Sequence, residues 1–456
     1  MSRKFKKPDY EATLNTAIQL REALPENHLA RFVVDIVSQL DLSSLYQRYG
    51  AIGGEAIAPE LLLAMLFYGY ATGVFSSRKI ERSSYESIPF RYLAGGLHPD
   101  HDTIANFRKM FLPEIEGLFV QILLLAAQSG VFKLGNISID GTKIHADASK
   151  SKAISYKRLG ELESQLRLEV SELMTMSSQV DEGELVLPEG MVVVDEIALR
   201  QTRLANLAQA RVVLETRAQE RDTIERAEYE DKIRQREAKA RHSKRKPRGP
   251  QPKAPTPGPR DKDQYNFSDP ESRIMKNTTD KGVDQHYNAQ VAVDQSSLFI
   301  IGHSLSNHAN DKQELAPTLD AISPALGQVT AAAVDNGYFS ADNIKVCIAR
   351  GIEPYIATGR EAHHRSWQAF FSSPAAPPPD DATPTVKMAY KLKTAAGRAI
   401  YRLRKSTVEP VIGNIKEVLG FRQFSLRGVA AVSGEWGLVC LAFNLKRFHG
   451  LLTRCA

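Results

Sequence analysis

Three acidic residues, each in a different local context, are the side chains in this sequence best suited to chemistry. Asp140 and Asp335 each end a short apolar, strand-like run, where a carboxylate is delivered to the edge of a sheet. Glu409 lies instead in the basic, amphipathic segment 406–416, which has a helical pattern. Two strand-end carboxylates and one helical carboxylate offer the hard oxygen ligands that suit a pair of divalent cations, and such a pair suits phosphoryl transfer.

Each acid also has an ordinary structural interpretation. Asp140 precedes a glycine and Asp335 precedes Asn-Gly, so either side chain fits a turn. Glu409 precedes Pro410, which is typical of a helix start, where a carboxylate is structurally favourable. A further acid, Glu435, is followed by an apolar face and is expected to pack within its helix. Taken together, the first three acids favour a metal site over three separate turns and caps.

The elements that must position these acids alternate between strands and helices in the second half of the chain. Hydrophobic patterning predicts a strand, a turn and a second short extended piece within 136–147, and further strands at 287–294, 298–305, 329–334 and 353–357. It predicts helices through most of 1–130, at 310–326, at 340–350 and in two pieces from 395 to 450. The first two acids therefore follow the first and fourth of these strands, and the third lies in a late helix.

A long segment of different composition interrupts this alternation. Apolar residues recur at spacings of three and four, which predicts a helical seam, at Leu159, Leu162, Leu166, Val170 and Leu173. A similar spacing resumes after an interruption at 182–191, so residues 150–245 are expected to form an antiparallel helical hairpin. Residues 246–261 are basic and rich in proline and glycine, and are expected to be a flexible linker. The pattern leaves open whether the hairpin contacts DNA, a partner subunit or only solvent.

Five sequence blocks, in this order, resemble the DDE transposases of bacterial insertion sequences. They are 70–81 with 98–108, 139–149, 269–273 with 287–294, 334–340, and 408–416 followed by 421–427 and 435–445. The resemblance implies an α/β fold, with an RNase H-like mixed sheet and flanking helices, split by the long helical insertion and preceded by an all-helical N-terminal domain. The implied domains are a DNA-binding domain at 1–130, a catalytic domain at 131–149 and 262–456, the hairpin at 150–245 and the linker at 246–261.

The resemblance also implies an activity and its residues. Asp140, Asp335 and Glu409 would be the catalytic triad and would hold two Mg²⁺ ions, with Mn²⁺ as the other possibility. The implied reactions are cleavage at the terminal inverted repeats of an element and joining of its ends to target DNA, by in-line displacement at phosphorus. The rival hypotheses are a catalytically inactive or repurposed DNA-binding protein of the same fold, and a nuclease that cuts without joining.

Basic residues around the glutamate are candidate DNA contacts. Lys416 follows Glu409 by seven residues, two α-helical turns on the same face. A related subgroup has a Tyr–Arg–Glu–Lys pattern here, but in this chain Lys405 takes the arginine place and Arg402 the tyrosine place. A basic face survives the departure, so the expected DNA-binding residues are Lys416, Arg404, Lys405 and Arg402. Further basic side chains are expected on the surface of the N-terminal helices: Arg78, Lys79, Arg82, Arg91, Arg108 and Lys109.

Bulk composition bounds the setting in which this chemistry would occur. The 456 residues carry a net charge of +6, which suits a polyanionic partner such as DNA without demanding one. Three scattered cysteines form neither a CxxC pair nor a disulfide framework, so a reducing cytoplasm is expected. The apolar stretches 61–70 and 118–127 are too short to span a bilayer, and no membrane partner is expected. Two DNA ends must be brought together, so a homodimer or a higher synaptic complex is expected.

Overall fold

The computed structural model describes residues 19–49, 56–184, 186, 188, 190–243, 249–277, 282–359 and 376–455. These residues form a mixed α/β structure that divides into two compact units. The first unit comprises Met1–Ile144 and Tyr287–Ala456, and the second comprises His145–His286. The predicted linker spans residues 246–261, and its first part, up to residue 248, lies outside the described residues. The division into DNA-binding, catalytic and insertion domains stays a prediction.

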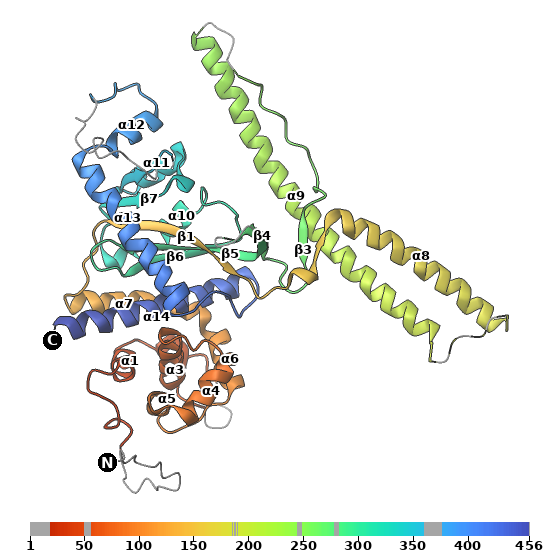
Figure 1. Ribbon diagram of the computed structural model, residues 1–456, viewed down its shortest axis with the longest axis horizontal. Helices are drawn as coiled ribbons and strands as arrows, with labels where there is room; N and C mark the ends of the chain where they lie inside the picture. The colour runs from red at the N-terminus through yellow and green to blue at the C-terminus, as the bar shows by residue number, and fades with distance from the viewer. Residues whose placement is uncertain are drawn as a thin grey trace, which may run out of the picture. The chain divides into compact units, whose positions relative to one another are not determined.

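A mixed sheet with the strand order β6-β5-β1-β7-β8 forms the centre of the first unit (Figure 1). β7 runs parallel to β1 and β8 runs parallel to β7, whereas β6 is antiparallel to β5. The predicted strands are confirmed, with small shifts at their ends: β1 (Ile137–His145), β5 (Val283–Asp294), β6 (Ile300–Ser306), β7 (Ala331–Val334) and β8 (Glu353–Ile356). All four residues of β7 are buried, as expected for a central parallel strand.

Helices from the C-terminal part of the chain pack on this sheet. α13 (Ala395–Gly413) contacts β7 and β8, and α14 (Val429–Cys455) contacts β6. A π-helical turn, Asn414–Val418, follows α13 directly. α11 (Ala341–Ala349) begins as predicted, because the Ser340 hydroxyl accepts a hydrogen bond from the Asn343 backbone N–H. A shorter helix, α12 (Pro384–Lys391), precedes α13.

The helix predicted at 310–326 is confirmed only in part. Only α10 (Leu315–Asp320) and a 3₁₀ turn at Pro324–Leu326 are helical there. Before α10, the side chain of Asp311 is hydrogen-bonded to strand β5 instead of capping a helix. After α10, the Ser323-Pro324 sequence ends helical geometry because proline disfavours it in the preceding residue.

The residues before the sheet are helical. α3 begins with Pro59 at its first position, which costs no hydrogen bond there, and most of its apolar side chains are buried. Both α3 and α7 pack against α14, and Figure 1 shows α7 and α14 lying side by side. The helices are α1 (Leu29–Val37), α2 (Ser43–Tyr46), α3 (Pro59–Ala71), α4 (Ser77–Glu86), α5 (Ile88–Leu93), α6 (His101–Phe111) and α7 (Ile115–Gln128).

One of the basic residues expected at the surface of these helices is buried. Arg108 donates from Nη1 to the Tyr70 hydroxyl at 2.9 Å and to the Phe75 carbonyl at 3.1 Å. The Tyr70 hydroxyl in turn donates to Glu435 Oε1 at 3.2 Å, and both side chains are fully buried. The prediction was therefore wrong for Arg108, because an internal carboxylate compensates its charge through Tyr70. The other five basic residues are exposed.

Among the described residues, the helical stretch His101–Gln128 is long and apolar enough to cross a membrane by length and composition. It contains α6 and α7, and 44% of its most apolar window is buried inside the structure. A helix that packs in the core of a globular domain has the same properties, and α7 packs against α14. The stretch is accordingly weak evidence for a membrane segment.

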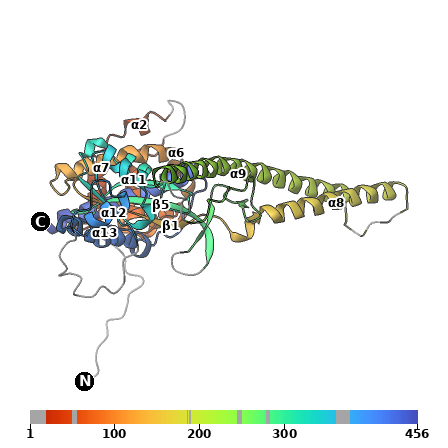
Figure 2. The ribbon, with the colours of Figure 1, turned by 90° about the horizontal axis from the view of Figure 1, so that it is seen from above.

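The second unit is dominated by two long helices, α8 (Tyr156–Asp181) and α9 (Val193–Ser243). They lie side by side as a hairpin (Figure 2), joined by an apolar cluster that includes Leu159, Leu166, Leu207 and Leu214. The chain then returns along the far part of α9, where Arg236 donates to the Gly249 carbonyl at 2.8 Å. Three short strands complete the unit: β2 (Ala153–Ser155) pairs with β3 (Gln264–Asn266), and β4 (Arg273–Lys276) with the start of β5.

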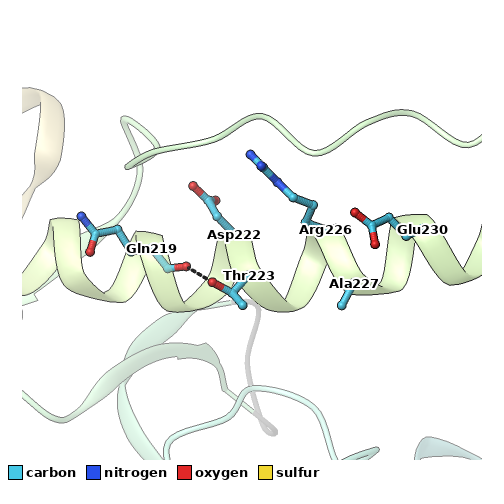
Figure 3. A pocket seen from close by; sticks show the side chains of 6 residues that line it. All are labelled: Gln219, Asp222, Thr223, Arg226, Ala227 and Glu230. Atoms are coloured by element: carbon cyan, nitrogen blue, oxygen red, sulfur yellow. Dashed lines mark hydrogen bonds between the residues drawn. The ribbon is translucent and has the colours of Figure 1, made fainter.

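A pocket in the second unit lies on α9 alone. Figure 3 shows its lining side chains along successive turns of the helix, beside the returning chain: Gln219, Asp222, Thr223, Arg226, Ala227 and Glu230. The Asp222 carboxylate accepts a hydrogen bond from the Gly258 backbone N–H in this returning chain. None of the acids singled out from the sequence lines the pocket.

Candidate functional site

The register of the parallel strands places two of the predicted acids side by side, just beyond the paired residues of β1 and β7. Ile139 of β1 pairs with Val334 of β7, so Asp140 and Asp335 are the next residues along adjacent strands. Asp335 Oδ1 accepts a hydrogen bond from the Gly337 N–H at 2.7 Å, and Asp140 Oδ1 accepts one from its neighbour Gly141 at 2.9 Å. The turn interpretation is correct for Asp335, whose side chain caps the 3₁₀ turn Asn336–Tyr338. For Asp140 both the turn and the predicted place at a strand end are wrong, because β1 continues without a break from Ile137 to His145.

The environment of Asp140 opposes its negative charge. Burial is the main cause that raises the pKa of the Asp140 carboxyl to about 6, and the nearby charges of Asp335 and Asp311 act in the same direction. The guanidinium of Arg404 and the N–H of Gly141 act in the opposite direction but do not compensate fully. Crowded carboxylates of this kind favour binding of a cation, because a bound cation relieves their repulsion.

Arg404 of α13 joins the third predicted acid to the first. Its Nη1 lies 2.9 Å from Asp140 Oδ2 and its Nη2 lies 3.3 Å from Glu409 Oε1. Burial alone would lower the pKa of Arg404, but the charges of Asp140 and other neighbours, Glu409 among them, outweigh it and raise the pKa. Glu409 is thus held near the two aspartates through a shared, nearly buried guanidinium.

The helix-start interpretation of Glu409 is wrong. Its helix begins at Ala395, where the Thr394 hydroxyl caps it, and Pro410 lies inside α13. The Glu409 side chain is 49% exposed, and its charge is not offset by a helix N-terminus. Helix capping therefore does not explain the position of the Glu409 carboxylate.

The basic residues predicted to contact DNA differ in their surroundings. Arg402 and Lys405 are exposed, whereas Arg404 is buried in the ion pairs with the two acids. Lys416 is partly buried, and its Nζ donates to the Lys143 carbonyl of β1 at 2.9 Å. It lies in the π-helical turn, so the α-helical spacing from Glu409 does not apply. Burial lowers the pKa of Lys416. DNA binding by these four residues stays a prediction.

A group of polar residues that was not predicted from the sequence lies beside the aspartates. Asp311 Oδ1 accepts hydrogen bonds from Asn288 at 2.8 Å and Gln290 at 3.1 Å, and Gln290 Oε1 accepts one from the Tyr338 hydroxyl. The available signal was in β5, where Asn288 and Gln290 interrupt an apolar strand and are buried. Burial and then the charge of Asp311 raise the pKa of Tyr338 well above its ordinary range.

The donor chemistry of the site fits a hard divalent cation. Asp140 and Asp335 would hold it, with Glu409 as a further carboxylate ligand. Within the described part of the chain, however, no three His, Cys, Asp or Glu side chains are gathered closely enough to hold an ion. Arg404 occupies the place between the first and third acids.

Two segments of the chain match known protein families. Residues 18–110 match a transposase domain (DUF772), and residues 381–449 match a transposase DDE domain. The two matches support a DDE transposase of an insertion element. The second match contains Glu409, Arg404 and Lys416, whereas Asp140 and Asp335 lie outside both matches. No curated protein and no solved structure matches the transposase.

The two matched segments of the transposase are in direct contact. Tyr70 and Arg108 belong to the first and Glu435 to the second, and they form the buried chain of hydrogen bonds described above. Glu435 also accepts from the backbone N–H groups of Ser425 and Leu426 at 2.9 and 3.0 Å. Glu435 therefore stabilises the fold, in agreement with the packing role predicted for it.

Proposed function

We propose that this transposase cleaves DNA at the terminal inverted repeats of its element and joins the ends to target DNA, with Asp140, Asp335 and Glu409 as its catalytic triad. The observation that carries the proposal is that one guanidinium, Arg404, binds the first and third acids, while the first and second lie just beyond the last paired residues of two parallel strands. Three acids separated by long stretches of sequence have no common structural need to converge in this way. The strand order and late helix also support an RNase H-like catalytic domain.

The residues divide the work as follows. Two divalent cations, Mg²⁺ or Mn²⁺, would activate the attacking water or DNA 3′-hydroxyl and stabilise the leaving oxygen. Asp140 and Asp335 would hold the cations from the sheet edge, and Glu409 from α13. The exposed Arg402 and Lys405 on the same helix are suited to bind DNA phosphates. Arg404 and Lys416 would contribute where the DNA backbone enters the site.

The remaining parts of the proposal concern partners. The N-terminal helices would bind the inverted repeats, supported by the exposed basic residues of α4, α5 and α6. Synapsis of two ends requires at least two copies of the transposase, so a homodimer or a larger complex in the cytoplasm is proposed. The second candidate, a DNA-binding protein that has lost its chemistry, is disfavoured by the retained triad.

The test is a cleavage and joining assay with purified transposase, Mg²⁺ and a labelled duplex that carries the ends of the element. Asp140→Asn, Asp335→Asn and Glu409→Gln remove one charge each with little change of shape, and each is expected to abolish cleavage while end binding persists. Asp342→Asn, at a side chain that is 88% exposed on α11, is the matched control and should cleave normally. Full cleavage by any of the three variants contradicts the triad, and binding without cleavage by the wild type under several metals supports the inactive protein.

A further inference from the structure

Asp311 precedes α10 in sequence but is bound to the central sheet. Its Oδ1 accepts from Asn288 Nδ2 at 2.8 Å and from Gln290 Nε2 at 3.1 Å. These donors are two residues apart on β5, so they project from the same face of the strand. Both bonds end on Oδ1, and among the described residues Oδ2 has no hydrogen-bond partner. The acid is therefore oriented through one oxygen and keeps the other for a different interaction.

Gln290 links Asp311 to the turn that carries the second aspartate. Its Nε2 donates to Asp311 Oδ1 and to Asn288 Oδ1, and its Oε1 accepts from the hydroxyl of Tyr338. The reverse orientation of the amide would place its oxygen against the Asp311 carboxylate, where the two would repel each other. The charge of Asp311 thus fixes the amide, and the amide fixes Tyr338, three residues after Asp335.

The same network touches β1 beside the first aspartate. A Cβ atom added to Gly141 would collide with Gln290 Nε2, so the amide lies directly against the backbone beside Asp140. A Cβ atom added to Gly337 would lie 3.0 Å from Asp335 Oδ1 and 3.5 Å from Asp311 Oδ2. Both carboxylates therefore face the Asn336–Tyr338 turn, and the charge of Asp311 reaches Asp140 as well.

We propose that Asp311 is a positioning residue of the divalent-cation site: it orients the Gln290 amide between Asp140 on β1 and the turn after Asp335, and adds a negative charge beside the two aspartates. The inference rests on the proposed function, because it takes Asp140 and Asp335 as the residues that hold the cation. It adds to that function a residue that touches neither DNA nor the reacting atoms. Residues that orient metal ligands in this way commonly change metal affinity when they are replaced.

Asp311→Asn separates charge from hydrogen bonding, because an asparagine carbonyl oxygen can still accept both bonds from β5. Titration of the full-length variant with Mn²⁺ alone, by calorimetry without DNA, should show roughly tenfold weaker binding than the wild type. Thermal unfolding in EDTA should be nearly unchanged. Asp342→Asn removes the same charge from an exposed position and should bind Mn²⁺ as the wild type does.

Tyr338→Phe is a second variant. It keeps every charge and removes the hydroxyl that donates a hydrogen bond to Gln290. It should also bind Mn²⁺ more weakly than the wild type, and it decides the question if the Asp311 variant does not fold. Wild-type affinity in either folded variant overturns the positioning role and leaves the triad intact. A wild-type transposase that binds no Mn²⁺, with Asp335→Asn indistinguishable from it, overturns the cation site and the positioning role together.

Discussion

The hydroxyl oxygens of Ser138 and Thr407 are hydrogen-bonded at 2.8 Å inside the protein, and each residue lies two positions before an acid of the proposed triad. Ser138 is on β1 before Asp140, and Thr407 is on α13 before Glu409. Both side chains are buried. This contact fixes the helix against the strand close to the site, so the spacing of the two acids depends on it.

Replacement of Thr407 by valine should therefore affect both stability and activity. The shape is preserved, but the inter-element bond is lost, and we expect the free energy of unfolding in urea to fall by about 1 kcal/mol. Ser138 keeps its bond from Gln295 at 3.0 Å, which limits the loss. Cleavage should slow as well, because α13 is less firmly held.

Thr453→Val is the matched control for this variant. The Thr453 hydroxyl bonds only to carbonyls of its own helix, at His449 and Gly450, and its side chain is exposed. This variant should keep wild-type cleavage. Equal effects of the two substitutions would show that the loss reflects helix chemistry and not the contact with β1.

Arg404→Met should destabilise the protein more than any surface ion-pair substitution. The variant leaves Asp140 without the guanidinium charge of Arg404. This loss raises the pKa of the Asp140 carboxyl further and costs about 3 kcal/mol in the free energy of unfolding. The free energy of unfolding of Arg404→Lys should fall between those of the wild type and Arg404→Met, because an ammonium group lacks the planar guanidinium geometry that binds two carboxylates. Urea denaturation without DNA or metal measures the effect independently of any role in DNA binding.

Arg350→Met provides the comparison for Arg404. Arg350 pairs with Asp320 at 2.7 Å, but the aspartate side chain is 60% exposed. Loss of an exposed pair costs at most about 1 kcal/mol. If the Arg404 variant is no less stable than this one, the guanidinium does not hold the acids as the structure indicates.

Gly141→Ala should damage the site without altering any charge. The new methyl group meets the Gln290 amide, which is fully buried and hydrogen-bonded through both its nitrogen and its oxygen, so β1 or the amide must shift. We expect a loss of about 2 kcal/mol in stability and slower cleavage. Gly135→Ala, at a position with open space around the added atom, should change neither quantity. Normal cleavage by the Gly141 variant would contradict the close packing of this part of β1.

Local patterns predicted the strands and the place of Asp335 after β7, because buried strands have a composition and spacing that few other elements share. They wrongly ended the first strand at Asp140, which lies inside β1. They did not predict Asp311, since its partners on β5 are more than twenty residues away and nothing local distinguishes it from a helix cap. The helix predicted at 310–326 was confirmed only in part for the same reason. A buried Asn-x-Gln pair within a central strand was the only sign that a polar network lay there.

The position of Arg404 shows a second limit of sequence reasoning. Spacing within one helix placed it among several basic residues, but only the packing of α13 on the sheet distinguishes it from the exposed Arg402 and Lys405. Pro410 led to a wrong prediction for a similar reason, because a proline marks the start of a helix only where no helical turns precede it. Long-range packing, which a single sequence does not encode locally, decided both cases.

Because of His303 on β6, we expect the protein to lose stability as the pH falls. Burial lowers the pKa of its imidazole to about 4, and the one carboxylate that the described residues place beside it, Glu116 at 3.5 Å, is 56% exposed and screened by solvent. The unfolded chain binds this proton near pH 6.5 and the folded protein only near pH 4, so stability falls with decreasing pH between these values and levels off below them. The contribution of His303 to this loss should be about 2 kcal/mol between pH 7.5 and pH 5, measured by urea denaturation as the difference between the wild type and His303→Gln. If both proteins lose stability in parallel over this range, the imidazole is not held neutral in the fold.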